Sequence, residues 1–330
     1  MKTSQKKVLV TGGAGYIGSF AVRQLLTSGY DVAVFDNLST GFRESVSSRA
    51  QLVVGDLREK SDVKKLFSSL KFDAVLHFAA KTVVPDSVKY PDDYFENNFG
   101  GSQNLFNEAV SAGVQSFIFS STAAVYAPTD KEMIDETDAC RPLNPYGESK
   151  LLTEKYLAEL AENLKINVTS LRYFNVAGAS LASDLGQKTK NATHLIKVAC
   201  EVAAGKRKQL EVFGTDYETV DGSAVRDYIH VEDLVAAHLL ALESLSSQQG
   251  HRILNCGYGR GASVYEVIES VERASGKKLN VVSAPRREGD AAKVVANPAQ
   301  IKKELSWRPK HDSLDEICRT AFLWEKSIKF

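Results

Sequence analysis

The fold is decided by the stretch Lys7-Val8-Leu9-Val10-Thr11-Gly12-Gly13-Ala14-Gly15-Tyr16-Ile17-Gly18. Its first five residues form a short apolar run ended by glycines, which predicts a buried strand. A segment with helical periodicity, Ser19–Leu26, follows the last glycine. In such a strand–turn–helix the glycines let the backbone approach a pyrophosphate, whose charge the helix N-terminus stabilises. The spacing is Gly-x-x-Gly-x-x-Gly and not the commoner Gly-x-Gly-x-x-Gly, but the context predicts dinucleotide binding.

A second apolar run, Asp31–Phe35, ends in Asp36 and completes a strand–glycines–helix–strand–acid order. A carboxylate at this strand end accepts hydrogen bonds from an adenosine ribose and repels a 2′-phosphate. Asp36 therefore favours NAD over NADP as the cofactor. The alternative is a solvated turn aspartate ahead of Asn37.

Strand-like and helix-like segments continue to alternate along the first half of the chain. The expected strands are Gln51–Val54, Asp73–His77, Ser116–Ser120 and Val168–Arg172, and the expected helices lie near Ser61–Ser69, after Pro91 and after Pro145. Six or so strands separated by helices predict an α/β fold of the Rossmann type, with a doubly wound parallel sheet. Ligands bind at the carboxyl ends of such strands, so we expect one edge to gather Gly12–Gly18, Asp36, Asp56, Phe78, Thr122 and Tyr173.

After Asn175 the alternation loosens. The segment Val176–Lys190 is rich in Ala, Gly, Ser and Asp, as a loop near a pocket would be. One more strand–helix unit, Asp227–His230 and Val231–Leu245, is followed by shorter elements. Two late helices are expected, Pro298–Leu305 and Ser313–Lys326.

These patterns predict two interleaved domains. We expect an NAD-binding Rossmann domain formed by residues 1–176 and about 227–250. A smaller, C-terminal substrate domain would comprise residues 177–226 and 251–330. A chain of 330 residues, 43% of them apolar, is long enough for both.

Charge and cysteine content exclude several functions. The 41 basic and 41 acidic side chains balance, so the chain lacks the electrostatic footprint of a general nucleic-acid or anionic-membrane binder. Its cysteines lie far apart without a Cys-x-x-Cys pair, so neither a metal site nor a disulfide framework is expected. The polar start, Met1–Lys7, and the lack of a long apolar run predict a cytoplasmic protein with no membrane partner.

The strongest candidate for chemistry is Asn144-Pro145-Tyr146-Gly147-Glu148-Ser149-Lys150. Pro145 suits the first turn of a helix, so Tyr146 and Lys150 fall one turn apart on one face. An adjacent ammonium favours the tyrosinate, and each unit by which the pKa falls from about 10 corresponds to roughly 1.4 kcal/mol. About 4 kcal/mol from two positive charges would make Tyr146 a general base near neutral pH. On its own this spacing often arises by chance.

Together the motifs resemble the extended short-chain dehydrogenase/reductase family and, within it, the UDP-glucose 4-epimerases. The superfamily motifs are Val10–Gly18, Phe35-Asp36-Asn37-Leu38-Ser39-Thr40-Gly41, His77-Phe78-Ala79-Ala80, Tyr146–Lys150 and Leu171-Arg172-Tyr173-Phe174-Asn175. Two later runs look like nucleotide-sugar 4-epimerases: Gly222-Ser223-Ala224-Val225-Arg226-Asp227-Tyr228-Ile229-His230-Val231 and Pro285-Arg286-Arg287-Glu288-Gly289-Asp290. The resemblance spans nearly the entire chain.

This resemblance implies an isomerase that keeps NAD bound and inverts C4 of a UDP-hexose. Tyr146, ionised with help from Lys150 and the nicotinamide charge, would take the proton of the 4-hydroxyl while the hydride on C4 moves to NAD. The 4-keto sugar would then turn over and take the hydride back on its other face. Thr122, where the family more often has serine, would hydrogen-bond the reacting oxygen.

The resemblance also assigns binding residues. Those implied at the cofactor are Gly12, Gly15, Tyr16, Ile17, Gly18, Asp36, Asn37, Ser39, Thr40, Asp56, Leu57, Phe78, Ala79, Asn97, Lys150 and Tyr173. Those implied at the UDP-sugar are Thr122, Tyr146, Asn175, Arg226, Arg287, Asp290 and Val294. Guanidinium groups suit this task because they bind diphosphate oxygens in pairs.

The chain departs from the family pattern at several positions. A lysine expected at Thr82 is absent, although Lys81 precedes it, and His194 stands where some relatives have asparagine. Ala127 replaces a common glycine. Val294 matches a position that is a bulky tyrosine in members restricted to plain hexoses, so we predict that UDP-GlcNAc and UDP-GalNAc are also accepted.

Competing functions remain open from the sequence. A 4,6-dehydratase would need an Asp-Glu pair after Thr122, but Ala123 and Ala124 stand there. The sequence poorly distinguishes 4-epimerisation of a UDP-hexose from that of UDP-xylose/arabinose or of a uronic acid. One substituent at C5 changes the size of the pocket by only a few atoms. A non-catalytic NAD-binding sensor of the same fold is a further alternative. The family resemblance further implies a homodimer, because in this superfamily the Pro91 helix and the Tyr146 helix usually pair across a two-fold axis, and both have an apolar stripe here.

Overall fold

The computed structural model of the chain describes residues 6–190, 192–287 and 289–328. The first five residues of the polar start and Glu288 of the Pro285–Asp290 run therefore lie outside the described residues. The chain divides into two compact units. Unit 1 comprises Met1–Ala127, Ala139–Arg172 and Val235–Leu254, and unit 2 comprises Pro128–Asp138, Tyr173–Leu234 and Asn255–Phe330.

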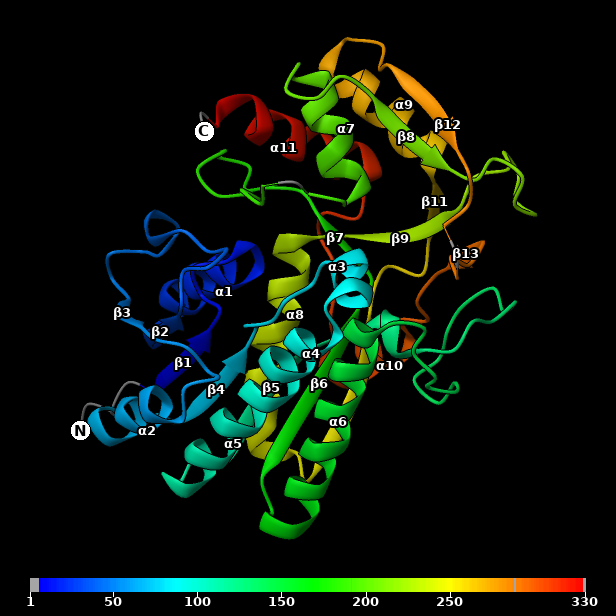
Figure 1. Cartoon of the computed structure of the whole chain (residues 1–330). Coiled ribbons are helices and arrows are strands. Elements are labelled where there is room, and N and C mark those ends of the chain that lie inside the picture. The colour runs from blue at the N-terminus through cyan, green and yellow to red at the C-terminus, as the bar shows by residue number, and fades with distance from the viewer. Residues whose placement is uncertain (1–5, 191, 288, 329–330) are drawn as a thin grey trace. The chain divides into compact units, whose positions relative to one another are not determined.

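Unit 1 is built on a seven-stranded sheet in the order β10-β6-β5-β4-β1-β2-β3 (Figure 1). The pairs β1–β2, β1–β4, β2–β3 and β4–β5 are parallel. The chain runs outward from β1 to β3 and resumes at β4 on the other side, so the sheet is doubly wound, as predicted. The strands are β1 (Lys7–Thr11), β2 (Asp31–Asp36), β3 (Gln51–Val54), β4 (Ala74–His77), β5 (Ser116–Thr122), β6 (Asn167–Tyr173) and β10 (His251–Cys256).

Helices cover both faces of this sheet. On one face α2 (Lys60–Ser69), α5 (Gly101–Ser111) and α6 (Pro145–Leu164) share an apolar core with the strands, in which Phe106 packs on Phe117. The opposite face carries α1 (Tyr16–Thr27) and α8 (Val231–Ser244). Successive side chains of a strand point to opposite faces of the sheet. Because helices cover both faces, the inner strands are continuous apolar runs, in which neighbours such as Leu9 and Val10 are both buried.

The helix expected after Pro91 is interrupted. It consists of α4 (Pro91–Tyr94), a π-helical segment η2 (Phe95–Gly100) and α5, and it is preceded by α3 (Val84–Lys89). A π-helical turn inserts one residue into a helix and often marks a functional site. Asn97 and Asn98 lie within it. Apolar periodicity does not register a single inserted residue, which is why the sequence predicts a continuous helix.

Unit 2 contains two smaller sheets. In the first, β9 pairs with β7 and β13 in parallel and with β11 antiparallel, and in the second β12 pairs with β8 in parallel. The strands are β7 (Asn175–Ala177), β8 (Leu210–Phe213), β9 (Val225–His230), β11 (Gly261–Ser263), β12 (Val281–Ala284) and β13 (Lys293–Val294). The helices are α7 (Leu195–Ala203), α9 (Val264–Ser275), α10 (Ala299–Leu305) and α11 (Leu314–Ser327). Short helical turns elsewhere in the chain are η1 (Arg43–Ser45), η3 (Ala123–Val125) and η4 (Leu245–Ser247).

The two longest departures of the units from the predicted domain limits are at residues 227–234 and 128–138. β9 belongs to unit 2 because its hydrogen-bonded neighbours β7, β11 and β13 do, so the returning segment of unit 1 begins at Val235. The loop Pro128–Asp138 also belongs to unit 2, where Ile134 N donates to Val295 O at 2.9 Å. Over the described part of the chain, no helix combines the length and apolarity needed to cross a membrane.

Candidate functional site

The glycine turn after β1 has the shape that a pyrophosphate requires. Gly12 has a φ of +71°, and a Cβ there would lie 2.6 Å from the Ala79 backbone nitrogen. A Cβ at Gly18 would lie 2.1 Å from Gly12 O, so neither position accommodates a side chain. Among the described residues no side chain caps α1 at Gly15, and its first turn has no acidic residue. The positive end of the α1 dipole therefore faces no acidic side chain in its first turn, which fits the pyrophosphate of NAD.

Asp36 ends β2 beside this turn. Its Oδ2 accepts a hydrogen bond from Ala14 N at 2.9 Å, and its Oδ1 accepts one from Leu38 N at 2.8 Å. A carboxylate oxygen accepts more than one hydrogen bond, so Asp36 is fixed and can still accept from ribose hydroxyls. The following side chain, Asn37, accepts hydrogen bonds from Ser39 N at 3.0 Å and from Ser39 Oγ at 2.7 Å.

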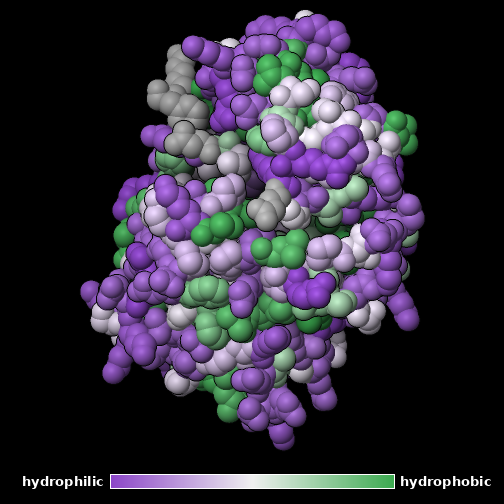
Figure 2. Space-filling model, turned by 45° about the vertical axis from the view of Figure 1, so that its right-hand side comes forward, coloured by the Kyte–Doolittle hydropathy of each residue, from purple (hydrophilic) through white to green (hydrophobic). Residues whose placement is uncertain are grey.

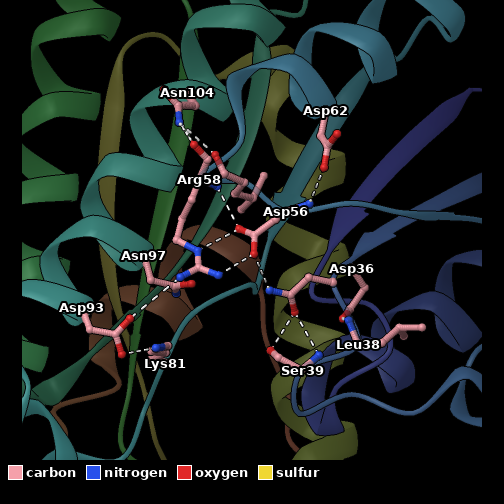
Figure 3. Close-up of polar contacts among 12 residues, drawn as sticks. Asp36, Leu38, Ser39, Asp56, Arg58, Asp62, Lys81, Asp93, Asn97 and Asn104 are labelled. Carbon is pink, nitrogen blue, oxygen red and sulfur yellow. Dashed lines mark hydrogen bonds and ion pairs between the residues drawn. The ribbon is translucent and has the colours of Figure 1, made fainter.

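Asp56 lies just beyond β3 and is held by a guanidinium that the sequence analysis did not identify (Figure 3). Arg58 donates its Nε to Asp56 Oδ1 at 3.1 Å and its Nη2 to Oδ2 at 2.7 Å. Asn37 Nδ2 also donates to Asp56 Oδ2, at 3.0 Å. The hydrogen bonds from Arg58 hold the pKa of Asp56 well below its usual range. Asn37 and Asp56 thus form one polar cluster with Asp36 nearby in sequence and space.

Lys81, which follows the His77–Ala80 motif, pairs with a carboxylate. Lys81 Nζ forms an ion pair with Asp93, and Arg58 Nη1 lies 3.9 Å from the same carboxylate. Thr82 stands at the position of the missing lysine, so the ribose contact remains unsupported by either side chain. Asp93 instead joins the chain after β4 to the chain after β3.

Of the two asparagines in η2, Asn97 was predicted at the cofactor, and Asn98 is the one most firmly held. Asn98 is 2% exposed, accepts from Lys81 N at 2.8 Å and donates to Ser149 Oγ at 3.1 Å. Asn97 is half-buried and donates to Asn98 Oδ1 at 2.9 Å. Asn98 therefore ties η2 to α6 and fixes Asn97 beside it.

The other predicted cofactor residues of unit 1 border the same sheet edge. Phe78 follows β4 and its ring centre lies 4.8 Å from that of His238 on α8. Leu57 is buried, and its carbonyl accepts from Asn104 Nδ2 at 2.9 Å. Tyr16 and Ile17, in the first turn of α1, and Ala79 are half-buried, and Thr40 is exposed.

Tyr146 and Lys150 lie one turn apart on the buried face of α6. The helix begins at Pro145, as predicted, and the Asn144 side chain caps it by accepting Gly147 N at 2.9 Å. Lys150 Nζ donates to Ser120 O at 2.9 Å. Since Ser120 lies on β5, the carboxyl edge of the sheet positions the lysine directly.

Thr122 ends β5, and its hydroxyl lies close enough to the Tyr146 phenol to lower the pKa of that phenol. Its oxygen accepts a hydrogen bond from Ala124 N at 3.1 Å, and the hydroxyl keeps a proton that it can donate. Thr122, Tyr146 and Lys150 thus lie on neighbouring elements of unit 1, and their catalytic roles stay a prediction.

The pKa values show what the protein groups contribute by themselves. Burial raises the pKa of Tyr146 above its ordinary value, and the hydrogen bond from Thr122 opposes this rise. Burial also lowers the pKa of Lys150 to about 7, opposed by the Glu154 carboxylate. Desolvation disfavours both charged forms. Ionisation of Tyr146 near neutral pH therefore needs a charge beyond those of the dyad.

In unit 2 the sequence-predicted substrate residues cluster on β9 and its neighbours. Arg226 lies on β9, donates Nη1 to Val225 O at 2.8 Å and forms an ion pair with Asp290. Val294 of β13 is the direct cross-strand partner of Arg226. Asn175 begins β7, which pairs with β9, and its Nδ2 lies 3.4 Å from Asp227 O.

Two arginines in this unit lie on aromatic rings. The Arg287 guanidinium carbon is 3.8 Å from the ring centre of Phe213, at the end of β8. Arg286 lies 4.2 Å from the ring centre of Tyr217 and forms an ion pair with Asp216. The sequence analysis missed Phe213, whose only signal was an aromatic residue ahead of Gly214.

Two further residues named from the sequence are Tyr173 and His194. Tyr173 is the last residue of β6, half-buried, and belongs to unit 2. His194 is the N-cap residue of α7, with Nδ1 3.3 Å from Gln187 Nε2. In the described residues, no group of three or more His, Cys, Asp or Glu side chains could hold a metal ion.

Comparison with known proteins defines the class. Residues 8–257 match the NAD dependent epimerase/dehydratase family. Together with the Rossmann sheet and the glycine turn, this match shows that the chain belongs to that family.

The more similar relatives are named for one activity. The chain is 46% identical over 323 residues to the UDP-glucose 4-epimerase of Azospirillum brasilense, covering 98% of this chain and 93% of that protein. The crystal structure of UDP-glucose 4-epimerase from Brucella ovis in complex with NAD has a TM-score of 0.93 and 40% identity, covering 97% of this chain and 98% of that chain. The UDP-Glc/GlcNAc 4-epimerase of Campylobacter jejuni has a TM-score of 0.86 and 44% identity, covering 98% of this chain and 100% of that chain.

Proposed function

We propose that this chain is a UDP-glucose 4-epimerase that interconverts UDP-glucose and UDP-galactose with NAD as its bound cofactor. The observation that carries the proposal is the cluster of Tyr146, Lys150 and Thr122 at the carboxyl edge of the sheet that also carries the glycine turn. The relatives named above support the activity, because two of the three bear this name.

In this proposal Tyr146 is the general base. It takes the proton of the sugar 4-hydroxyl, and Thr122 holds the same oxygen through its hydroxyl. Bound NAD supplies an acceptor for the hydride on C4 and a positive charge beside the dyad. Lys150, whose Nζ donates to Ser120 O at 2.9 Å, stabilises the phenolate, and Tyr146 would give the proton back to the sugar oxygen at the end of the cycle.

Residues of unit 2 bind the UDP part. Arg226 and Arg287 present guanidinium groups, which bind diphosphate oxygens in bidentate fashion. Arg226 pairs with Asp290, so binding of a diphosphate exchanges one anionic partner for another. Asp290 can then accept hydrogen bonds from a ribose. The Phe213 ring, on which Arg287 lies in this structure, offers an aromatic face for the uracil.

We also propose that the sugar site accepts an N-acetyl group at C2. Val294 is half-buried and lies directly across from Arg226 in the β9–β13 pair. A valine occupies much less space than a tyrosine. The likeness to the UDP-Glc/GlcNAc 4-epimerase of Campylobacter jejuni supports this extension.

Incubation of the purified protein with UDP-galactose, UDP-GalNAc and UDP-arabinose, without added NAD, tests the proposal. NMR of the products should show the 4-epimers of the first two sugars. Turnover of UDP-arabinose alone would assign the chain to pentose epimerisation, and no turnover of any sugar would leave a non-catalytic NAD-binding protein.

We further propose that the protein is a cytoplasmic homodimer. Hydrophobic side chains gather in patches between hydrophilic ones on the face shown in Figure 2. The exposed large apolar residues of unit 1 include Val84, Val88 and Tyr90 around α3, Leu143 before α6 and Leu164 at its end. Pairing of such surfaces about a two-fold axis would bury them. Light scattering at micromolar concentration should give twice the chain mass, and a monomer would contradict this.

A further inference from the structure

A buried carboxylate lies one helical turn beyond Lys150. Tyr146, Lys150 and Glu154 follow one another at four-residue spacing on α6, and they are 9%, 3% and 2% exposed. Residues spaced by four stack on the same face of a helix. A glutamate is almost never buried to this extent unless it is paired, so its partners indicate its role.

Donors from two strands hold Glu154. Ser121 Oγ on β5 hydrogen-bonds to its Oε1. Arg172 on β6 donates Nε to Oε1 at 2.9 Å and Nη2 to Oε2. Arg172 is itself 3% exposed, and its guanidinium carbon lies 4.8 Å from the ring centre of Tyr126. The carboxylate is therefore fixed between α6, β5 and β6.

Ser121 connects this ion pair to the reactive groups. It stands between Ser120, whose carbonyl accepts the Lys150 ammonium, and Thr122, whose hydroxyl bonds Tyr146. Adjacent residues in a strand share rigid peptide planes, so a bond that fixes the middle residue also fixes its neighbours. Glu154 thereby sets the strand end that positions both members of the dyad.

The charges around Lys150 show a second effect. From β4 it faces His77, which burial keeps neutral by lowering its pKa well below the usual value, and from β5 it faces the Phe119 ring at 4.8 Å. Glu154, on the same helix, is the charge that raises the pKa of Lys150 against the lowering caused by burial.

Two other titratable groups face Glu154, besides Arg172. His251 on β10 has its pKa lowered to about 4 by burial, and burial also raises the pKa of the Cys140 thiol. Both are therefore uncharged at pH 7. Arg172 keeps its positive charge because the paired carboxylate raises its pKa.

We propose that Glu154 is a positioning residue for the proposed epimerisation. Through Ser121 it fixes the strand end that carries Ser120 and Thr122, and its negative charge favours the ammonium form of Lys150. This proposal rests on the proposed function, since it assigns Glu154 to the support of Tyr146 as base and gives it no contact with substrate.

The Glu154→Gln variant should narrow the pH range of activity from both sides. Without the carboxylate, Lys150 loses its proton at lower pH, so the alkaline limb of kcat/KM moves down. A less charged Lys150 stabilises the phenolate less, so the acid limb moves up. Removal of a neighbouring charge shifts a pKa by about one unit or more. We therefore expect each limb to move by about one pH unit and the rate at the optimum to fall about tenfold.

A second readout does not depend on turnover. Titration of the near-ultraviolet tyrosinate absorbance, with the Tyr146→Phe protein subtracted, should show that Tyr146 ionises at higher pH in Glu154→Gln. If Glu154→Gln fails to fold because Arg172 is left unpaired, the Glu154→Gln/Arg172→Met double variant removes both charges and should narrow the profile likewise.

Glu325→Gln is the matched control. Glu325 of α11 is 0% exposed and forms an ion pair with the buried Lys197 of α7, all within unit 2. This variant should lose stability and leave both pH limbs unchanged. Limbs that stay at their wild-type positions in both Glu154 variants would overturn the proposal. If Tyr146→Phe is inactive in that case, the proposed function still stands. A Tyr146→Phe protein with wild-type turnover would instead contradict the proposed base.

Discussion

The two units present their functional residues in opposite ways. In unit 1 Tyr146 and Lys150 are buried, and backbone and strand-end groups such as Ser120 O and Thr122 fix them. In unit 2 the candidate residues are less buried and bind one another, as Arg226 does with Asp290. Burial shifts the pKa values of Tyr146 and Lys150, whereas the ion pair between Arg226 and Asp290 satisfies charges that a ligand can later take over.

This contrast separates two requirements of the proposed reaction. A proton-transfer group must be held in one geometry and kept from water, which a helix packed on a parallel sheet provides. Groups that recognise a charged nucleotide must be able to exchange partners when it binds. Variants in unit 1 should therefore change rate and pH dependence, and variants in unit 2 should change substrate affinity and choice.

The largest effect is expected for Tyr146→Phe. The change removes one oxygen from a buried ring and leaves its packing, so the protein should fold and retain NAD. Loss of the general base should lower kcat by about 10²–10⁴-fold. A coupled assay of UDP-glucose formation measures the loss of kcat. Quantification of bound NAD after denaturation checks that the variant retains the cofactor. Turnover close to wild type would remove the base from unit 1.

Lys150→Met should change how the free energy of unfolding depends on pH, because burial lowers the pKa of the lysine that the substitution removes. The folded pKa of about 7 lies below the ordinary 10.5, so the unfolded chain binds more protons between these values. Stability of the wild type should thus rise from pH 7 toward pH 10 by at most roughly 5 kcal/mol. Methionine carries no charge, so the variant should be more stable than wild type at pH 7 and lack this rise.

Chemical unfolding at pH 7 and pH 9.5 without added NAD measures this difference. Lys197→Met is the matched change in unit 2, where the buried lysine pairs with Glu325. Breaking that pair should destabilise the protein at both pH values. A wild-type protein whose stability relative to Lys150→Met does not change with pH would contradict the burial argument.

Arg226→Lys tests recognition in unit 2. Lysine keeps the charge but loses the planar fork, so KM for UDP-galactose should rise about tenfold or more while kcat changes little. Arg260→Lys is the control, because Arg260 is an exposed arginine of the same unit paired with Asp312. A fall in kcat with an unchanged KM would place Arg226 in the chemical step and blur the contrast between the units.

Val294→Tyr is expected to have the smallest effect on the parent reaction. The larger ring should reduce turnover of UDP-GalNAc by about 10–200-fold and leave that of UDP-galactose nearly unchanged. Val294→Ala should keep both activities. Equal losses for both sugars would show that residue 294 supports the fold of β13 and does not select the C2 substituent.

The sequence predicted those features that follow from local patterns. Alternating apolar runs located β1 to β6, and the strand-end rule brought Asp36, Asp56 and Thr122 to one edge. The polar pairs that cross long stretches of chain were not predictable. Glu154 and Arg172 lie on different elements, and Arg226 and Asp290 are 64 residues apart.

Two other features depend on packing and not on local pattern. In the π-helical turn at Asn97 and Asn98, the Asn98 side chain bonds both Lys81 and Ser149, which are distant in sequence. β10 completes the sheet with half-exposed residues at its start, so its sequence resembled a short irregular segment. The rise in the pKa of Tyr146 likewise reflects burial, which a residue spacing does not report.

Epimerisation of UDP-galactose labelled with deuterium at C4 tests most directly the claim that Tyr146 removes a hydroxyl proton while hydrogen on carbon stays within the site. The wild-type protein, as isolated and in ordinary water, should form UDP-glucose that retains the label at C4. Loss of deuterium to solvent would show that the C4–H bond is broken by a base, and the proposed role of Tyr146 would be wrong.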